Sequence, residues 1–384
     1  MKIAYSFWGF LADIKLDENY NEISTPDGNA FYSWSIIREL KKRNHDVIAI
    51  MPDRDVYSVN KFGKEAFSAW CTDKRYLAYC DLQKINYSDI DWKSATKEKL
   101  FAIWNDYDVD KCDAVLHEWR MTIKNRNDMS SRTEKNWQPD YFIQSCLIEY
   151  CKLNKIKMIV FDLDYKLCIG DIHDFMHIIE LGKKWEMSVY PSTRVYIPFD
   201  FSSINYFDIV SSRRCSSDLV YIGNRYERDW CIDKYLPDKC TVYGNWKEAC
   251  RDSEVRWPNI DFRNRIQLRD MRNAYSDAVC TILLAKEEYC RHSFMTARII
   301  ESIFYGSLPL FIEEYGEKTI QEFAGKYADK LTVKSREDVV DKINYFKTHE
   351  DARLMILCYL RAYLHKMDAS FFVNTLEEIV RDLL

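Results

Sequence analysis

A carboxylate and several cations are grouped between Tyr289 and Phe311, in the run YCRHSFMTARIIESIFYGSLPLF. Glu301 falls near the middle of an expected helix, on the face opposite an apolar stripe. The basic side chains of Arg291, His292 and Arg298 are close to it in the chain. A carboxylate can accept ribose hydroxyls and cations can face a diphosphate, so this grouping suits a sugar-nucleotide. The alternative is a solvated helix face that carries a few charges.

A glycine and two arginines follow an expected strand in the run YIGNRYER, from Tyr221 to Arg228. Gly223 ends the strand, and a glycine allows the backbone to approach a ligand closely. Arg225 and Arg228 come before the next helix, where they can neutralise a diphosphate leaving group. The alternative is an ordinary strand–turn–helix with exposed arginines.

The pair Asp162 and Asp164 ends another expected strand and has several interpretations. It resembles the signature of haloacid dehalogenase phosphatases, whose first aspartate is the nucleophile, although Lys166 stands where that family has Thr or Val. Such a pair can also hold Mg²⁺ against a phosphate. A third interpretation is that Asp164 reaches a reacting carbon. A fourth is that one aspartate caps the next segment.

Two histidines raise the question of a metal. His173 and His177 are four residues apart and would share one face of a helix, where two imidazoles can bind a metal. No glutamate follows His173, so the zinc-protease pattern is not present. We therefore predict no metal site.

Two loops are candidates for contacts with anions. The turn that ends in Gly28 and Asn29 stands before an expected helix, whose N–H groups and dipole attract an anion, or it is a plain N-cap. Gly9 lies in the loop after the first strand. A charged loop contains Lys124, Arg126 and Arg132, which can touch a phosphate backbone or can simply be solvated.

The elements that position these residues alternate between strands and helices. The strand Lys2 to Ser6, the amphipathic helix Asn29 to Arg43 and the strand Val47 to Met51 form a β-loop-α-β unit, whose right-handed crossover implies a parallel sheet. Strands are also expected at Asp113 to His117, Lys157 to Phe161, Leu219 to Ile222, Cys240 to Tyr243, Ala278 to Leu284, Leu308 to Phe311 and near Leu331 to Val333. Helices are expected at Tyr141 to Leu153, Asp229 to Leu236, Arg265 to Tyr275, around Glu301, from Lys318 and Arg336, and at Ser370 to Leu384.

This order predicts an α/β fold with two Rossmann-like domains that face a cleft. Pro191 and Pro198 mark a linker between them. We expect an acceptor domain over residues 1–195, a donor domain over 196–365, and a C-terminal helix, residues 366–384, that packs back towards the N-terminal domain. Ligands bind at the C-terminal ends of the strands in such sheets.

Composition excludes several classes of protein. The 384 residues include 13 cysteines without a C-x-x-C pair, which indicates a reducing cytoplasm and no disulfide framework. The net charge of −5 is not that of a generally basic nucleic-acid binder, although a local basic groove stays possible. We find no long apolar run, and we expect no membrane contact.

The segments described above resemble those of GT-B glycosyltransferases. The helix with Glu301, followed by Gly306 and Pro309, resembles the E-x4-G-x-x-P segment of their donor domain, in which the glutamate holds the donor ribose. The run with Gly223, Arg225 and Arg228 resembles their diphosphate-contacting loop. Retaining members often have a second glutamate eight residues before the first, and Ser293 occupies that position here.

A closer resemblance is to the DNA α-glucosyltransferases of T-even phages, which act on hydroxymethylcytosine. It covers three segments: Lys157 to Asp164, Ser293 to Phe311, and Asp368 to the final helix. The resemblance implies a donor site of Gly223, Arg225, Arg228, Arg291, Ser293, Arg298 and Glu301. It implies that Asp164 acts at the reaction centre.

These observations together predict a glycosyltransferase that moves a hexose or pentose from a nucleotide-sugar, for which we favour a UDP-sugar, to a hydroxyl group. The resemblance implies retention of configuration and an acceptor hydroxymethylpyrimidine in double-stranded phage DNA, in the host cytoplasm. No metal or other cofactor is expected if arginines carry the phosphate charge. Three alternatives remain open: a polysaccharide, lipid or small-molecule acceptor, a non-catalytic nucleotide-sugar-binding module, and a phosphatase that uses Asp162.

Overall fold

The computed structural model describes residues 1–7, 15–16, 22–24, 28–50, 82–87, 89–91, 94–119, 139–163, 167–182, 190, 192–201, 215–246, 252–266 and 268–383. The chain divides into two compact units. Unit 1 consists of Met1–Ser203 together with Asp368–Leu384, and unit 2 consists of Ile204–Met367.

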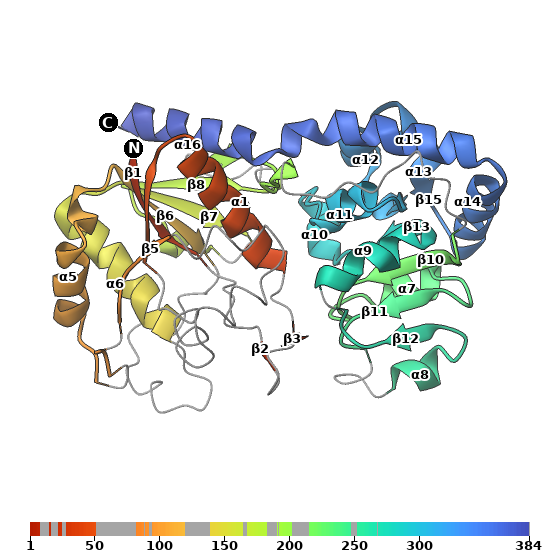
Figure 1. Cartoon of the computed structure of the whole chain (residues 1–384), viewed down its shortest axis with the longest axis horizontal. Coiled ribbons are helices and arrows are strands. Elements are labelled where there is room, and N and C mark those ends of the chain that lie inside the picture. The colour runs from red at the N-terminus through yellow and green to blue at the C-terminus, as the bar shows by residue number, and fades with distance from the viewer. Residues whose placement is uncertain are drawn as a thin grey trace. The chain divides into compact units, whose positions relative to one another are not determined.

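Unit 1 is built on a sheet whose strands β1, β5, β6, β7 and β8 are labelled in Figure 1. The sheet is parallel, and the strand order in its described part is β5-β4-β1-β6-β7-β8-β9. The central strands are buried on both faces because helices cover them, which is typical of parallel sheets. The strands are β1 (Lys2–Ser6), β4 (Asp46–Ala49), β5 (Gln83–Lys84), β6 (Ala114–Trp119), β7 (Met158–Asp162), β8 (Met176–Glu180) and β9 (Ser192–Arg194), with a separate antiparallel pair, β2 (Lys15–Leu16) and β3 (Glu22–Ser24).

The helices of unit 1 come from both of its segments, Met1–Ser203 and Asp368–Leu384. They are α1 (Gly28–Lys42), α5 (Lys97–Asp106), α6 (Pro139–Asn154) and α16 (Ala369–Leu383), with 3₁₀ turns η2 (Val109–Lys111) and η5 (Ile169–Asp171). The start of α16 is tied to the chain before unit 2, because the Ala369 amide donates to the Phe199 carbonyl at 2.9 Å. The C-terminal helix therefore packs on the N-terminal domain, as predicted.

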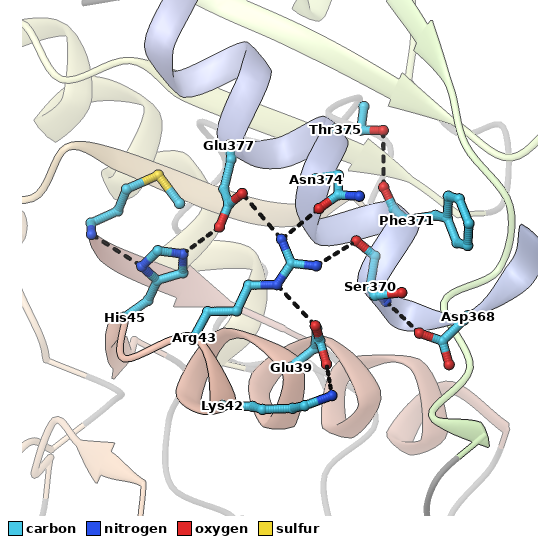
Figure 2. Close-up of polar contacts among 11 residues, drawn as sticks. Glu39, Lys42, Arg43, His45, Asp368, Ser370, Phe371, Asn374, Thr375 and Glu377 are labelled. Atoms are coloured by element: carbon cyan, nitrogen blue, oxygen red, sulfur yellow. Dashed lines mark hydrogen bonds and ion pairs between the residues drawn. The ribbon is translucent and has the colours of Figure 1, made fainter.

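Arg43, just after α1, holds α16 in place (Figure 2). Its guanidinium donates to Glu39 Oε1 at 2.9 Å, to Asn374 Oδ1 at 2.6 Å, to Glu377 Oε2 at 3.1 Å and to the Ser370 carbonyl at 2.9 Å. One planar cation thereby joins both helices, which is geometry that a lysine could not reproduce.

Unit 2 has a second parallel sheet, with the order β12-β11-β10-β13-β14-β15 in its described part. The strands are β10 (Ser217–Ile222), β11 (Thr241–Tyr243), β12 (Asp261–Arg263), β13 (Ala278–Leu283), β14 (Leu308–Ile312) and β15 (Thr332–Val333). The helices are α7 (Asp229–Tyr235), α8 (Ser253–Arg256), α9 (Leu268–Ser276), α10 (Glu287–Arg291), α11 (Arg298–Phe304), α12 (Glu317–Ala324), α13 (Ala328–Leu331), α14 (Arg336–Thr348) and α15 (Glu350–Tyr363), with 3₁₀ turns η7 (Glu313–Tyr315), η8 (Gly325–Tyr327) and η9 (Leu364–Met367).

The turn from α11 to β14 is fixed by α15. Gly306 has a φ of 91°, which is the left-handed conformation that glycine adopts easily after a helix. Arg353 donates to the Gly306 carbonyl at 2.9 Å, and Arg361 donates to the carbonyls of Ile303 at 3.2 Å and Phe304 at 2.9 Å. These cations donate to carbonyl groups at the end of α11, where the regular pattern of helical hydrogen bonds stops.

Several elements differ from the sequence predictions. The segment with His173 and His177 is not a helix, because His177 lies in strand β8. The expected linker between Pro191 and Pro198 contains strand β9. Helices α5 and α15 were not predicted. None of the helices in the described ranges is long and apolar enough to cross a membrane.

Candidate functional site

The predicted donor residues follow β10 and β13, the two neighbouring strands of unit 2 between which the order of strand addition reverses. The chain runs from β10 to β11 and β12 on one side, and then returns to β13 on the other side of β10. Parallel sheets bind ligands at the carboxyl ends of the two strands on either side of such a switch point. Gly223 directly follows β10, and α10 and α11 both lie between β13 and β14.

Glu301 is buried, with only 5% of its surface exposed. It lies in the middle of α11, where every residue from Ile299 to Phe304 is buried. Burial and the charge of Glu301 together raise the pKa of Tyr275 well above its usual value. The alternative of a solvated helix face is therefore wrong for this residue, because a buried carboxylate requires partners that offset its desolvation.

Arg298 lies beside the glycine that ends β10. Its guanidinium carbon is 5.6 Å from the centre of the Tyr221 ring, and it interacts electrostatically with Glu301. A β-carbon added to Gly223 would be 2.5 Å from the Tyr221 hydroxyl and 2.7 Å from Arg298 Nη2. Gly223 thus has a definite role, because any side chain there would displace the arginine or the tyrosine.

Two hydroxyl groups next to this cluster have no hydrogen-bond partner. The hydroxyls of Tyr221 and Tyr275 are buried and unpaired within the described residues, and both side chains have 0% exposure. Buried polar atoms are nearly always paired, so each exception requires an explanation. A polar ligand or a water molecule bound beside Arg298 and Glu301 would provide the partners.

Arg225 is engaged by two carboxylates. It forms a bidentate pair with Asp229, at 2.7 Å for both contacts, and it contacts Asp252 Oδ1 at 2.7 Å. Its guanidinium also lies 5.0 Å from the centre of the Trp257 ring. The hydrogen bond from Arg225 is the main reason why the pKa of Asp229 lies below its usual value. Arg225 would have to exchange these partners to bind a diphosphate.

Arg228 stabilises the loop after β10 from within. It is 4% exposed, and its Nη1 donates to the carbonyls of Asn224 at 3.3 Å and Tyr226 at 2.8 Å. Its Nε atom is buried without a partner in the described part of the chain. The two predicted arginines therefore have different partners: Arg225 donates to carboxylates, and Arg228 donates to backbone carbonyls of its own loop.

Ser293 and Arg291 differ in exposure. Ser293 is buried with a φ of 56°, and its hydroxyl accepts a hydrogen bond from Thr319 Oγ1 at 2.8 Å. Between them, His292 is buried, and burial lowers its pKa. Arg291 is exposed and lines a pocket of about 990 Å³ together with Arg225, Tyr226, Asn245, Glu287 and Glu288. These lining residues follow the carboxyl ends of β10, β11 and β13, so the pocket lies where a ligand is expected.

Most predicted residues of unit 1 lie outside the described ranges. These are Asp164, the proposed catalytic residue, together with Gly9, Lys124, Arg126 and Arg132. Gly28 and Asn29 begin helix α1, which agrees with the predicted helix start. Their roles stay predictions.

Asp162 is the last residue of β7 and is buried. Its Oδ2 accepts a hydrogen bond from the Leu167 amide at 3.1 Å. This contact agrees with the interpretation that one aspartate of the pair caps the following segment.

The metal interpretation of the histidine pair rested on a helix that is not formed. His177 Nε2 lies 2.8 Å from Thr193 Oγ1 on the neighbouring strand, and the ring of His173 stacks on Phe175. In the described residues there is no group of three or more His, Cys, Asp or Glu side chains that could hold a metal ion.

A buried polar cluster at the carboxyl end of β6 was not predicted from the sequence. Glu118 Oε1 accepts hydrogen bonds from the hydroxyls of Tyr5 at 2.7 Å and Ser33 at 2.8 Å. On the neighbouring residue, His117 contacts Ser6 Oγ at 2.9 Å. The signal was a histidine and a glutamate in the last residues of an apolar strand, because charged residues are seldom buried without a specific reason.

Several solved structures with a similar fold are glycosyltransferases. The β-glucosyltransferase of T4 phage, a DNA-modifying enzyme, aligns over 99% of both chains with a TM-score of 0.61 and 14% identity. In complex with UDP-glucose, it aligns over 95% of both chains with a TM-score of 0.58 and 15% identity. The chain has the GT-B fold.

Other enzymes with this GT-B fold come from bacteria. HepE of Anabaena, solved with UDP-glucose, aligns over 100% of both chains with a TM-score of 0.58 and 9% identity. The O-GlcNAc transferase of Thermobaculum terrenum aligns over 100% of this chain and 67% of its own, with a TM-score of 0.57 and 11% identity. No family model matches the sequence, and neither does any curated protein. At these identities the comparisons show the fold alone.

Proposed function

We propose that this chain is a glycosyltransferase that moves a hexose or pentose from a UDP-sugar to a hydroxyl group. The observation that carries the proposal is the buried carboxylate of Glu301 beside Arg298 and Gly223, at the switch point of a GT-B sheet. Structural neighbours that were solved with UDP-glucose support the choice of donor.

Glu301 would accept hydrogen bonds from the donor ribose, and Arg298 would neutralise the diphosphate. Transfer breaks the bond between the anomeric carbon and the diphosphate oxygen, and the acceptor oxygen forms the new bond and loses its proton. Negative charge builds up on the departing diphosphate, so a cation placed there before the reaction lowers the barrier. The exposed Arg291 can assist, and the unpaired hydroxyls of Tyr221 and Tyr275 can bind polar groups or water around the donor.

The proposed acceptor is a hydroxymethylpyrimidine in double-stranded phage DNA. The description of the T4 phage neighbour as a DNA-modifying enzyme supports it. Lys124, Arg126 and Arg132 would contact the DNA backbone, and a target base inside a duplex would have to be flipped out. Asp164 would position the hydroxyl or stabilise positive charge at the anomeric carbon, with retention of configuration. The reaction would take place in the cytoplasm of the infected host and would need no metal.

The test is mass spectrometry of nucleosides from hydroxymethylated duplex DNA, after incubation with the protein and a panel of UDP- and GDP-sugars, with and without EDTA. A gain of one sugar on the modified pyrimidine would establish both the donor and the acceptor. Asp164→Ala, which is expected to abolish transfer, serves as the inactive control. An equal gain in the presence of EDTA would establish that no metal is needed.

Two other outcomes would change the proposal. Hydrolysis of a nucleotide-sugar without transfer would retain the glycosyltransferase and exclude this acceptor. Neither transfer nor hydrolysis, despite donor binding, would indicate a non-catalytic nucleotide-sugar-binding module.

A further inference from the structure

Tyr226 occupies an unusual position in the pocket at the carboxyl ends of β10, β11 and β13. It is 64% exposed, more than other aromatic side chains whose burial is described, such as Phe371 at 49%. Single exposed apolar residues are common on protein surfaces and do not by themselves indicate a binding site. This ring, however, lies in the wall of a pocket of about 990 Å³ that is also lined by Arg225 and Arg291, two of the predicted donor residues.

The backbone that carries Tyr226 is held in place before any ligand binds. Arg228 Nη1 donates to the Tyr226 carbonyl at 2.8 Å and to the Asn224 carbonyl at 3.3 Å. The next residue, Glu227, has a φ of 55°, a left-handed conformation that is uncommon for a glutamate. Such conformations persist where the surrounding contacts enforce them, and they are concentrated at ligand-binding sites.

The ring itself is held from one side by a cation. Lys286 Nζ lies 4.4 Å from the centre of the Tyr226 ring and 5.2 Å from that of Tyr289. The same ammonium group is 3.8 Å from Glu227 Oε2. A cation at this distance attracts an aromatic face and limits its motion. Less conformational freedom is then lost when a flat ligand stacks on the ring.

The rest of the pocket suits a flat, polar ring. Asn245 offers an amide, Glu287 and Glu288 offer carboxylates, and Arg291 offers a cation, and all of them line the pocket. Such groups can pair with the edge of a heterocycle whose face lies on an aromatic platform. A nucleotide-sugar whose ribose is held by Glu301 and whose diphosphate is held by Arg298 has two remaining parts, the nucleobase and the transferred sugar. Of these two, only the nucleobase is a flat aromatic ring that can stack on a tyrosine.

We propose that Tyr226 is the stacking platform for the nucleobase of the donor, with Lys286 holding the ring in position. This inference rests on the proposed function, because it requires a nucleotide-sugar bound at Glu301. Tyr226 thereby has a binding role that its position in the sequence did not predict.

Calorimetric titration of the full-length protein with UDP and with inorganic pyrophosphate tests the proposal. Stacking on an aromatic side chain contributes on the order of tenfold or more to affinity, so Tyr226→Ala should raise the Kd for UDP by about tenfold. Pyrophosphate has no base, so its binding should not change. Tyr226→Phe should bind UDP as the wild type does, and Lys286→Met should show a smaller loss.

Tyr345→Ala is the matched control, because Tyr345 is an exposed tyrosine at 42% on helix α14 that does not line this pocket. Unchanged UDP affinity in Tyr226→Ala, with Glu301→Ala still weakening it, would overturn the inference and leave the proposed function intact. Equal losses for UDP and pyrophosphate would also overturn it. A wild-type protein that binds neither UDP nor GDP would remove the proposed function and this inference together.

Discussion

The energetic problem at Glu301 is the desolvation of a carboxylate. A buried ion is destabilising unless nearby charges and hydrogen bonds replace its water. Arg298 interacts electrostatically with Glu301 and can provide such a charge. The hydroxyls of Tyr221 and Tyr275 make no hydrogen bond within the described residues, so they can still bind a polar group. An unusually polar buried site is often a functional one, because stability alone would favour apolar packing.

Replacing Glu301 tests its proposed role in donor binding. Glu301→Ala should weaken UDP binding by about 1–3 kcal/mol, the scale of hydrogen bonds to a charged group. Titration calorimetry measures this loss. The variant also removes a buried charge, so its thermal unfolding is compared with that of the wild type. Unchanged affinity in a folded variant would remove Glu301 from the site.

Asp164 is predicted to act in the chemical step alone. Asp164→Ala should abolish sugar transfer, because no carboxylate would remain at the reaction centre, while UDP affinity stays near that of the wild type. The measurement pairs the nucleoside mass assay with UDP titration, and Asp162→Asn is the control. Full transfer by Asp164→Ala, or its loss only in Asp162→Asn, would refute this role.

Residue types in the sequence indicated Glu301, Arg298 and Gly223 as candidates, but they could not predict the surroundings of these residues. Arg225 illustrates the reason. Its partner Asp229 is only four residues away, and the local sequence could suggest that pair. Its second partner, Asp252, is 27 residues away in the chain, and nothing local indicates that contact. The unpaired tyrosine hydroxyls are likewise a product of tertiary packing. Sequence spacing predicts which groups are available, whereas packing decides what each one contacts.

At the scale of elements, the C-terminal end of α11, the helix that carries Glu301, is stabilised by hydrogen bonds from helix α15. Arg353 is 5% exposed and donates to the Gly306 carbonyl, while Arg361 covers the carbonyls of Ile303 and Phe304. Cations at a helix C-terminus also interact favourably with its dipole. Helix α15 therefore helps to position α11.

Removing the buried arginine should be costly for stability. Arg353→Met leaves the Gly306 carbonyl without this donor and should destabilise the protein by about 1–3 kcal/mol. Lys347→Met is the control, because Lys347 pairs with Asp218 at 2.8 Å on an exposed surface and such pairs contribute little. Thermal and urea unfolding measure both variants. Equal effects would contradict the assigned role of Arg353.

The elements that sequence periodicity predicted well are those with long or strongly apolar patterns. Helix α1 and strand β13 were found almost to the residue. The short run of β8, MHIIE, is also compatible with a turn of helix. That ambiguity led to the wrong prediction that His173 and His177 share one face of a helix. Short apolar runs take their conformation from the sheet they join, and their own sequence does not determine it.

At the scale of the whole molecule, unit 1 is completed by the last helix of the chain. Glu377 on α16 lies 2.7 Å from His45 Nε2 and 3.1 Å from Arg43 Nη1 (Figure 2). Burial alone would raise the pKa of Glu377, but the hydrogen bond with His45 and the charge of Arg43 outweigh it and hold that pKa below the usual value.

This lowered pKa predicts how stability depends on pH. A carboxylate with a depressed pKa in the folded state stabilises the fold above its ordinary pKa of 4.5 and loses that contribution as the pH falls. Glu377→Gln should therefore be less stable than the wild type by about 1 kcal/mol at neutral pH, with the gap closing below that value. Urea unfolding across this pH range measures the gap. Glu378→Gln, an exposed neighbour, is the control, and a gap that is independent of pH would contradict the prediction.

The interrupted sequence of unit 1 has a consequence for protein synthesis. Residues up to Ser203 leave the ribosome long before Asp368–Leu384, which belong to the same compact unit. Until those residues emerge, Arg43 lacks Asn374, Glu377 and the Ser370 carbonyl, and the helix α1 surface lacks its cover. Unit 2 is contiguous and can fold during translation. We therefore expect unit 1 to stay partly open, or bound to chaperones, until residues 368–384 have left the ribosome.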